Sequence, residues 1–591
     1  MERLEAIAFL NLNDPHGGAN NNMKPYLPQN DPEPQQRRNY LSHQQQAYRF
    51  DYDFLSPLVF LQEVPAVENF SAKYIAERVL ATAEILPNML AAKGRDFLDP
   101  FDELQDYEDL FTVLPLPKVA KVYQTNSSFA EQRLSGANPM VIRLLQANDP
   151  RAEVLKKIPS YKKEFEPLFD VPKELANGNI YIADYTGTDA NYRGPALVQG
   201  GTHEKGRKYL PKPRAFFWWR QTGIRDRGKL VPIAIQLEIA PDSHVYTPFD
   251  RPLDWLFAKF CVQIADGNHH EMNSHLGRTH VVMEPIAIGT AHHLAENHPL
   301  SLLLRPHFRF MLTNNHLAQE HLINPGGDVD ELLAGTLAES LELAKDAYEG
   351  WNLRDFAFPT EIKNRGLDDP DRLPHYPYRD DGLLLWNAIY TFVFGYLNYF
   401  YPTTQAIVDD SELQAWAREL SSPKEANGGK VKGMPDRIDT VTQLVEIVTA
   451  IVFTCGPQHS AVNFPQYEYM AFAPNMPLAA YRNMPEPHEL ITEKEILQLL
   501  PPYKRTADQL KTLYSLAAYR YDRLGNYDKS FQELYHEDYR DIFAGTPILD
   551  LLRQFQQDLN AAEQEIDADN QKRIVPYPFL KPSLVLNSIS I

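Results

Sequence analysis

HEMNSHLGRTH, residues 270–280, is the stretch of sequence that decides how this chain folds and what chemistry it can carry. Its histidines, His270, His275 and His280, recur every five residues. In an α-helix five residues advance by about 500°, which leaves such side chains roughly 140° apart around the axis. They share one face only where π-type turns widen the helix, and such turns occur mostly at functional sites. The spacing therefore indicates either a chance cluster or a face of ligands built on one helix.

The zinc-protease motif HExxH does not describe this stretch. His270 and Glu271 begin that motif, but the next histidine is His275, one residue too late for two ligands at positions i and i+4. A metal-binding face here needs a different helical geometry.

A second polar cluster follows an apolar run. The segment CGPQHSAVNFPQY, residues 455–467, comes directly after LVEIVTAIVF, residues 444–453, which is typical of a helix interior. His459 and Asn463 are four residues apart, so on a helix they share one face. Buried His, Asn and Gln side chains need polar partners, and metal ligation supplies one. The two clusters together favour a metal site over chance.

The composition excludes several classes of protein. The 591 residues include 58 Lys and Arg against 78 Asp and Glu, a formal net charge of −20. No basic surplus is available to neutralise phosphates, which excludes nucleic acid as a partner. An apolar fraction of 43% with 11% aromatic residues excludes a disordered chain. At roughly 150 residues per domain, length alone predicts about four domains.

The cysteine count and the N-terminal sequence bear on location. Cys261 and Cys455 are the two cysteines, too few for a disulfide framework, and they indicate a reducing compartment. MERLEAIAFLNLNDP, residues 1–15, is acidic and has no small-residue cleavage site, so we do not expect a signal peptide. We expect a cytoplasmic protein.

One segment raises the question of a membrane span. LLLWNAIYTFVFGYLNYFY, residues 383–401, has 19 residues without a charge, close to the length that crosses a bilayer. It contains two asparagines and a threonine, and it follows Arg379-Asp380-Asp381, an anionic rather than a positive flank. Because no other such run occurs in the sequence, we predict a buried helix and no transmembrane segment.

Composition changes along the chain predict its organisation. Residues 1–50 are rich in Asn, Gln and Pro and are predicted to form a polar, flexible extension. Apolar residues recur at helical intervals over 58–93 and again from 255 to about 523. Residues 178–240 carry β-branched and aromatic runs broken by Gly, Pro and Asp, which predicts a small sheet. No repeat or clear linker interrupts residues 51–591, against the four-domain estimate, and 421–436 is predicted to be an exposed loop.

Several further motifs occur in an order that resembles the lipoxygenase family. The histidine stretch is followed by His298-Pro299, Pro306-His307 and His459-x3-Asn463, and the chain ends in NSISI, residues 587–591. WLFAK (255–259), FPTEIKNRG (358–366) and PYRDDGLLLW (377–386) belong to the same set. The resemblance covers roughly residues 55–591. It is specific, because so many motifs in one order do not coincide by chance.

The resemblance implies a mainly α fold: one large lipoxygenase-type helical catalytic domain, residues 51–591, around a central metal-bearing helix pair with a small β subregion. It also implies one non-haem iron (Fe) per chain, with manganese as the less favoured metal. The implied ligands are His275, His280, His459, Asn463 and the carboxylate of Ile591. No catalytic side chain is implied beyond this centre. Imidazole and carboxylate ligands without thiolates agree with iron rather than structural zinc.

Residues beside the ligands also receive roles from the resemblance. His270 is implied to be a non-ligand that supports the site, and Glu271 and Gln466 are implied to orient ligands, as such partners do. For Glu271 the alternative is plain helix-surface polarity. Three positions are implied to line the substrate pocket, and core packing would explain each of them equally well: Ala318, Leu322 and Leu524.

Met476 stands where plant-type lipoxygenases often place an arginine that pairs with the fatty-acid carboxylate. A buried carboxylate without a partner is costly, so the substrate is expected to enter with its methyl end first. That orientation favours oxygenation near the ω-6 carbon, a 13S-type product. Ala318 agrees, because alanine at that position tends to accompany S products in the family.

The implied reaction is dioxygenation of a polyunsaturated fatty acid of the linoleate or linolenate class. A hydrogen atom leaves a bis-allylic carbon and O2 adds to the opposite face, which gives a hydroperoxide. The alternatives on the same site are a 9- or R-specific lipoxygenase and a hydroperoxide isomerase. A non-catalytic lipid-binding descendant would predict the loss of a ligand, and all five are present. Membrane contact, if used, falls to apolar residues around 58–90, and the net charge opposes anionic lipid.

Overall fold

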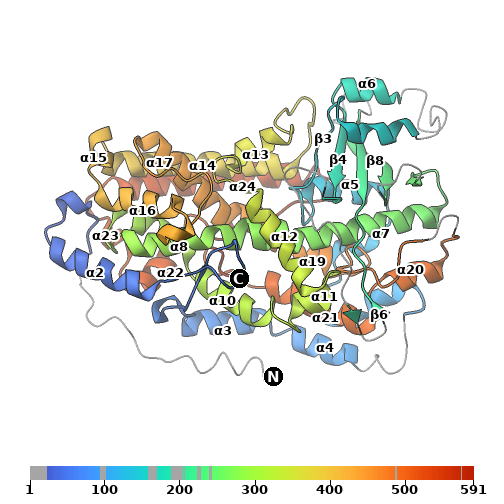
Figure 1. Ribbon diagram of the computed structural model, residues 1–591, viewed down its shortest axis with the longest axis horizontal. Coiled ribbons are helices and arrows are strands. Elements are labelled where there is room, and N and C mark those ends of the chain that lie inside the picture. Colours follow the sequence, from blue (N-terminus) through green and yellow to red (C-terminus); the bar gives the residue numbers. More distant parts are fainter. Residues whose placement is uncertain are drawn as a thin grey trace.

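Two continuous helices run through the middle of the protein. In the first, α7 (Pro252–His269), η8 (His270–Val281) and α8 (Val282–His293) follow one another without a break (Figure 1). The second consists of α17 (Val441–Phe453), η10 (Thr454–Gln458) and α18 (His459–Asn463). Segments η10 and α18 pack against η8. This pair is the predicted central helix pair.

The computed structural model describes residues 23–93, 101–157, 169–187, 202–203, 206–221, 228–238, 243–485, 489–573 and 575–591. Other helices surround the central pair, which confirms the mainly α fold: α3 (Ala72–Ala81), α4 (Ile85–Lys93), α5 (Asn126–Ser135), α6 (Val171–Ala176), α9 (Pro299–Phe308), α10 (Met311–His321), α11 (Asp328–Leu332), α12 (Leu337–Glu349), α13 (Phe358–Asn364), α14 (Pro377–Phe400), α15 (Thr404–Val408), α16 (Ser411–Ser421), α19 (Pro465–Met470), α20 (Glu493–Leu499), α21 (Tyr503–Ala517), α22 (Asp528–Tyr535), α23 (Tyr539–Ile542) and α24 (Ile548–Asn570). Short 3₁₀ turns connect them: η2 (Pro28–Asn30), η3 (Ala66–Glu68), η4 (Leu104–Leu110), η5 (Lys118–Lys121), η6 (Pro150–Lys157) and η9 (Lys424–Ala426).

The predicted sheet forms at one end of α7 (Figure 1). Its antiparallel order is β3 (Arg143–Leu144), β4 (Ile180–Asp184), β7 (Arg214–Arg220), β8 (Lys229–Gln236) and β9 (Val245–Tyr246). Alternate side chains face opposite sides, as in any strand. Phe217 and Trp219 belong to the main core, whereas Phe216 and Trp218 belong to a small second core on the other face. Burial of both faces explains the dense aromatic and aliphatic run. Two short pairs complete the strands: β1 (Phe50–Asp51) with β2 (Phe60–Leu61), and β5 (Thr202–His203) with β6 (Gly206–Arg207).

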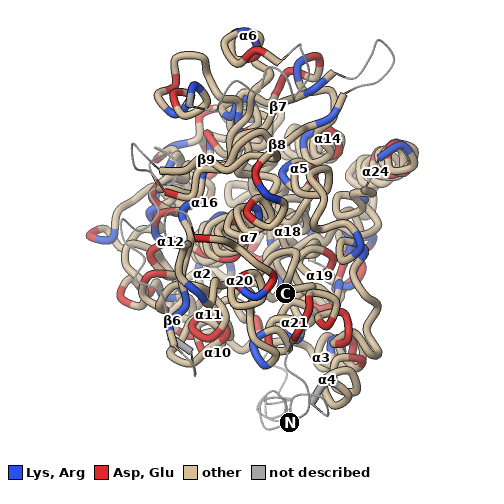
Figure 2. Tube along the Cα trace, turned by 90° about the vertical axis from the view of Figure 1, so that its right-hand side faces the viewer, with Lys and Arg blue, Asp and Glu red and all other residues tan. Residues whose placement is uncertain are grey.

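One main hydrophobic core contains buried side chains from Leu27 to Ile591. The described residues form one large core and one small one, not several cores of comparable size. The structure therefore gives no support to the estimate of four domains from length. Charged residues of both signs lie mostly around the outside of the trace, without a continuous basic stripe in the view of Figure 2. The domain boundary at residue 50 stays a prediction.

The prediction of a flexible extension over residues 1–50 is wrong for its second half. Pro34–Ala47 forms helix α2, with Pro at the start of the helix. Arg37 is buried, and its guanidinium lies 2.5 Å from Glu412 and 2.7 Å from Asp31. The helix is thus held by charge pairing with a distant part of the chain rather than by an apolar stripe. Residues 1–22 lie outside the described residues.

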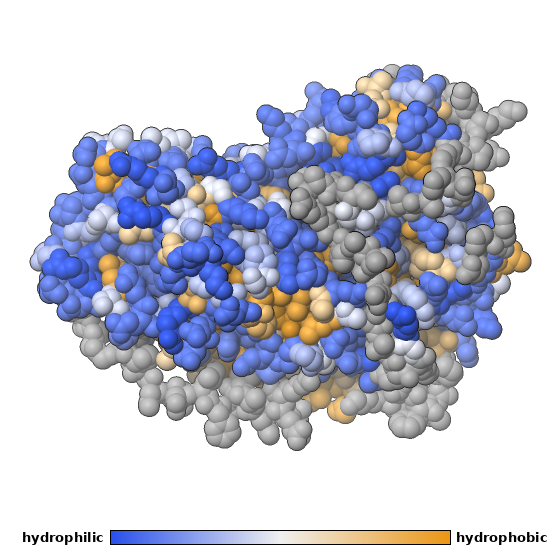
Figure 3. All heavy atoms as spheres, in the orientation of Figure 1, coloured by the Kyte–Doolittle hydropathy of each residue, from blue (hydrophilic) through white to orange (hydrophobic). Residues whose placement is uncertain are grey.

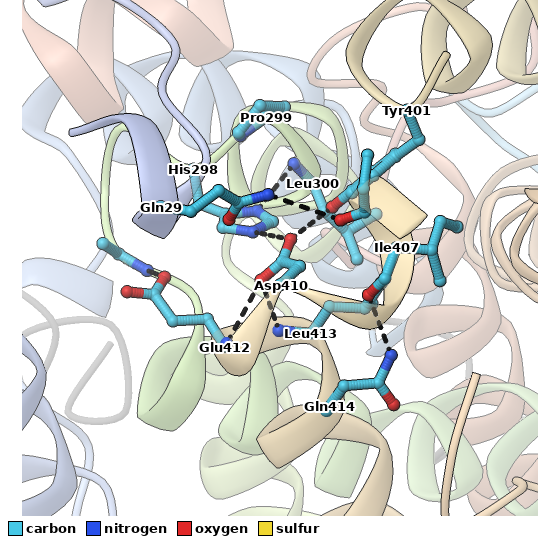
Figure 4. A network of polar contacts seen from close by, with 12 residues as sticks. Gln29, His298, Pro299, Leu300, Tyr401, Ile407, Asp410, Glu412, Leu413 and Gln414 are labelled. Atoms are coloured by element: carbon cyan, nitrogen blue, oxygen red, sulfur yellow. Dashed lines mark hydrogen bonds and ion pairs between the residues drawn. The ribbon is translucent and has the colours of Figure 1, made fainter. Parts of the chain in front are cut away.

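A buried polar network holds the next layer together and includes the His298-Pro299 motif (Figure 4). His298 accepts the backbone N–H of Leu300 with Nδ1, and its Nε2 lies 2.9 Å from Asp410. Asp410 also accepts the hydroxyl of Tyr401 at 2.6 Å and caps α16 through the N–H groups of Glu412 and Leu413. His298 therefore fixes the start of α9 and has a structural role.

Residues 383–400 of the apolar segment lie in α14, whose packing against α17 and α24 buries one face and leaves Phe394 and Tyr399 exposed. Among the described residues, one helical stretch, Val441–Met470, has the length and composition to cross a membrane, and 78% of its most apolar window is buried inside the protein.

Over 58–93 the chain is helical only in η3, α3 and α4. Within 421–436, residues 423–427 are exposed, as predicted for a loop, but the prediction is wrong for Gly428, Gly429, Val431 and Met434, which are buried.

Candidate metal centre

The five-residue spacing of the histidines is resolved by a π-helix. Segment η8 spans His270–Val281 and follows α7 directly. Its wider turn, with hydrogen bonds from i to i+5, brings residues five apart onto one face. The Nε2 atoms of His275 and His280 lie 3.3 Å apart. The widened helix predicted from the spacing is confirmed.

A second π-helix positions His459 and was not predicted. Segment η10 contains Gly456 and Pro457, which interrupt an otherwise apolar helix immediately before His459. Proline lacks an N–H, so the regular i→i−4 ladder is broken at this point. The result is that one ring nitrogen from each of His275, His280 and His459 lies within 4.8 Å of the others, and all three residues are buried.

The hydrogen bonds of these rings leave bare nitrogen atoms facing one another. Nδ1 of His280 lies 2.9 Å from Oδ1 of Asn315, and Nδ1 of His275 lies 3.6 Å from a carboxylate oxygen of Glu271. We infer that each Nδ1 carries the proton, because both partners are acceptors. The two Nε2 lone pairs then point at each other, and neither nitrogen of His459 has a hydrogen-bond partner among the described residues. A cation between the rings satisfies all three.

Burial keeps the three imidazoles neutral. It lowers the pKa of His280 to about 3, with His275 adding to the effect, and it lowers the pKa of His275 and of His459 as well. Neutral imidazole is the form that binds a metal ion. The donor set therefore fits a transition metal such as iron, and neither described cysteine is near enough to join the cluster.

His270 and Glu271 lie beside the cluster. Nε2 of His270 lies 2.7 Å from the carbonyl of Val462, and its Nδ1 lies 3.4 Å from Glu271. Burial alone would raise the pKa of Glu271, but His270 and His275 more than offset this effect and hold it well below its usual value. His270 thus joins the two central helices, and Glu271 orients the ring of His275. The Glu271 side chain is only 14% exposed, so it is not on an exposed helix surface.

Asn463 shares α18 with His459 and is fully buried. Its Oδ1 accepts a hydrogen bond from Nε2 of Gln466 at 2.9 Å, and its Nδ2 donates to the carbonyl of Leu516 at 2.8 Å. An amide oxygen has two lone pairs, so one remains for a second partner. The hydrogen bond from Gln466 therefore fixes the orientation of the Asn463 amide, because it identifies Oδ1 as the acceptor and leaves Nδ2 to donate to Leu516.

The C-terminal segment packs against the second central helix. The N–H of Leu586 donates to the hydroxyl of Ser460, and the carbonyl of Asn587 lies 2.7 Å from Nδ1 of His307. A Cβ at Gly456 would lie only 2.7 Å from the carbonyl oxygen of Leu586, so the close approach requires glycine there. Ile591 is buried. Ligation by its carboxylate stays a prediction.

The four predicted pocket residues do not share one described cavity. Ala318 in α10 and Leu322 at its end are half-buried, whereas Leu524 and Met476 are buried. A Cβ at Gly456 would lie 3.7 Å from Leu524, which places that leucine beside η10. A cavity of about 610 Å³ elsewhere in the described part of the chain is lined by none of the four. Their role in substrate binding stays a prediction.

Asn315 contacts the centre directly, and no motif in the sequence predicted a role for it. Its Nδ2 donates to Glu284 at 2.7 Å while its Oδ1 faces His280. Glu284 in turn accepts the N–H of Leu61. No spacing rule connects residues 280 and 315, so only the packing of α10 on η8 reveals this partner.

A second group of metal-type side chains comprises His292, His293 and Glu419. Nδ1 of His292 lies 2.8 Å from Glu419, and its Nε2 faces the carbonyl of Tyr48. Both nitrogens face acceptors, which requires a protonated ring with no lone pair for a metal. Burial alone would lower the pKa of His292, but Glu419 reverses the effect and raises it. This group is an ion pair.

Comparison with known proteins identifies the family. The lipoxygenase family model matches residues 96–576, most of the chain. The chain belongs to the lipoxygenase family. A linoleate 9/13-lipoxygenase from Pseudomonas aeruginosa is 32% identical over 511 residues, which cover 83% of this chain and 70% of that protein. A human hydroperoxide isomerase is 31% identical over 86% of this lipoxygenase chain and 68% of its own length.

Two further comparisons define how far the likeness extends. An allene oxide synthase-lipoxygenase protein from Plexaura homomalla is 31% identical over 83% of this lipoxygenase chain, but the match spans only 46% of that longer protein. A solved lipoxygenase in complex with arachidonate superposes with a TM-score of 0.84 at 28% identity, covering 96% of this chain and 83% of the other. Lipoxygenases as a family are iron-dependent dioxygenases of polyunsaturated fatty acids, and the histidine cluster here fits that metal.

Proposed function

We propose that this lipoxygenase inserts O2 into linoleate or linolenate to give the 13S hydroperoxide. The observation that carries the activity is the cluster of three neutral, buried imidazoles with facing lone pairs. We propose that Asn463 and the carboxylate of Ile591 complete the ligand set around one iron. When bound, iron supplies the one-electron redox chemistry that hydrogen abstraction from a bis-allylic methylene requires.

The protein's own residues orient the ligands and exclude water. Glu271 and Asn315 hold the Nδ1 protons of His275 and His280, so both rings present Nε2 to the centre. Gln466 does the same for the amide of Asn463. The surrounding side chains are buried and largely apolar, which protects a radical intermediate of the substrate from water.

The 13S assignment rests on the orientation of the substrate. Met476 is fully buried and offers no positive charge to a carboxylate. A carboxylate at that depth would lose its hydration without gaining a partner. The methyl end is therefore proposed to enter first, which places the ω-6 pentadiene beside the metal. The alanine at position 318 supports the S configuration.

The first prediction concerns the product. The purified, iron-loaded protein is expected to consume O2 with linoleate, to build conjugated-diene absorbance, and to contain about one iron per chain. Chiral chromatography is expected to show the 13S hydroperoxide as the main product. A 9-hydroperoxide or an R product contradicts the orientation argument and leaves the dioxygenase in place. Epoxy alcohols formed from added hydroperoxide, without O2 uptake, would instead favour the isomerase. Full activity with manganese alone would overturn the choice of metal.

We also propose weak peripheral contact with lipid surfaces through α3 and α4. Four large aliphatic side chains on these helices are strongly exposed: Val79 (50%), Leu80 (75%), Leu86 (60%) and Leu90 (63%). The helices lie together at one edge of the molecule (Figure 1), and apolar residues reach the surface at that edge, near α4 (Figure 3). A net charge of −20 opposes anionic lipid, so the occupant is a zwitterionic surface.

The two described cysteines are buried and unpaired, which supports a reducing, cytoplasmic location.

The second prediction tests that contact. Replacement of Leu80 and Leu90 by serine is expected to lower the partition coefficient onto phosphatidylcholine vesicles, measured by sedimentation, by about 100-fold, because burial of each leucine contributes about 1.5 kcal/mol or more. The matched control is Leu490→Ser, which removes a leucine of similar exposure outside α3 and α4. Equal sedimentation of the double variant and the control contradicts the proposal.

A further inference from the structure

A cavity of about 610 Å³ lies apart from the histidine cluster. It is bounded by η5, the start of α5, α19, the end of α21 and the segment 575–584. Much of its lining is apolar: Val119, Leu230, Phe464, Val575, Phe579 and Leu584. Its volume falls within the range of small-molecule sites. The structure thus offers a cavity with room for an aliphatic chain away from the histidine cluster.

Arg520 supplies a positive charge on the wall of this cavity. Its guanidinium stacks 3.9 Å above the centre of the Phe464 ring, and its Nε donates to the carbonyl of Leu584 at 3.3 Å. Burial lowers the pKa of Arg520 to about 10, with no acidic group acting against it. The side chain therefore remains charged at pH 7 and has no carboxylate partner among the described residues. A partly buried charge without a counter-ion is costly unless a ligand compensates it.

The other charges around the cavity favour an anion. Lys118 and Lys229, both exposed, also line the cavity, together with Glu131 and Glu468. Glu131 is already engaged by His375 at 2.6 Å. Three cations therefore face one carboxylate that has no other partner in the described part of the chain, on a protein whose net charge is −20. Local positive charge on an acidic protein raises the local concentration of anionic ligands.

We infer that this cavity binds a long-chain aliphatic carboxylate, such as a free fatty acid, at a site separate from the reacting one. The carboxylate pairs with the Nη atoms of Arg520, and the alkyl chain lies among the six apolar residues named above. A guanidinium binds a carboxylate through two parallel hydrogen bonds, which fixes the head group. The inference concerns binding alone and does not depend on the proposed dioxygenase reaction.

The position of this site connects it to the metal centre. Phe464, under the guanidinium, directly follows Asn463, and Leu584 belongs to the segment that continues to Leu586 and Asn587 beside η10. A carboxylate bound to Arg520 therefore lies beside two segments that lead to proposed ligands. One contains Phe464, which follows Asn463, and the other runs from Leu584 towards Ile591.

The third prediction uses palmitic acid with a photoreactive diazirine at its methyl end, incubated with the iron-loaded full chain. Palmitate has no bis-allylic methylene, so labelling is independent of turnover. Mass spectrometry is expected to find label within the segments 119–122 and 575–584. Arg520→Gln is expected to lower this labelling about tenfold at subsaturating probe, because a charge-assisted hydrogen bond is lost. Arg437→Gln, which removes an exposed arginine that does not line this cavity, is the matched control and is expected to change labelling less than about twofold.

The methyl ester of the same probe keeps the alkyl chain and removes the charge. It is expected to label these segments about tenfold less than the acid on the unaltered protein, which tests the carboxylate even where Arg520→Gln fails to fold. Absence of label from the two segments overturns the site. Equal labelling by acid and ester, or by wild type and a folded Arg520→Gln variant, overturns the role of the guanidinium.

Discussion

His459→Gln is expected to remove iron from the protein and to abolish oxygen uptake with linoleate. His459 supplies the imidazole from the second central helix, and neither of its nitrogens has a hydrogen-bond partner in the part of the chain that the structure describes. A glutamine side chain cannot place a nitrogen lone pair at the same position. Loss of a residue that merely supports a metal ligand lowers affinity or activity by about 10- to 100-fold, so loss of a ligand is expected to lower both by at least about 100-fold. Elemental analysis and oxygen-electrode rates measure the two effects.

The matched control for this prediction is His316→Gln. His316 lies on α10, is half-exposed and stands 3.5 Å from Glu320, outside the cluster. It is expected to retain about one iron per chain and the wild-type rate. Full iron and full activity in His459→Gln would show that the three rings are not the metal site.

Arg133→Met is expected to destabilise the folded protein by about 3 to 5 kcal/mol. Arg133 in α5 lies 2.7 Å from Asp266 in α7, and both side chains are completely buried. Asp266 also accepts hydrogen bonds from Tyr185 and Asn138, both at 2.8 Å. Removal of the guanidinium leaves a buried carboxylate with hydrogen bonds but no opposite charge. Thermal unfolding of the iron-loaded protein measures the loss.

Two further variants separate charge burial from general damage. Arg251→Met removes an exposed cation paired with Asp254 and is expected to change stability by less than about 0.5 kcal/mol. The double variant Arg133→Met with Asp266→Leu is expected to be more stable than Arg133→Met alone, because no uncompensated charge remains. A single variant as stable as wild type would show that the pair contributes little to holding α5 on α7.

The sequence predicted the parts of the fold that depend on local periodicity. The five-residue histidine spacing required a widened helix, and η8 has that form. The aromatic and β-branched runs over 178–240 predicted strands, and β4, β7 and β8 lie there. Both signals are repeats along a single element, so no information about distant residues was needed.

Features that depend on distant partners could not be predicted in the same way. Helix α2 carries few apolar side chains, and its burial depends on the pairing of Arg37 with Glu412, 375 residues away. The second π-helix follows from Gly456 and Pro457 inside an apolar run, where no regular spacing of polar residues announces it. Asn315 reaches His280 only through the packing of α10. Each of these contacts is set by the tertiary fold.

The π-helix η8 places a constraint on how this protein can vary. His275 and His280 meet because the widened helix, with hydrogen bonds from i to i+5, brings residues five apart onto one face. Each residue inserted or deleted between them would rotate every later side chain by about 100° around the axis. Such a change would turn His280 away from His275 and would also displace α8, which continues the same helix. Relatives of this chain can therefore exchange side chains within the stretch far more readily than they can alter its length.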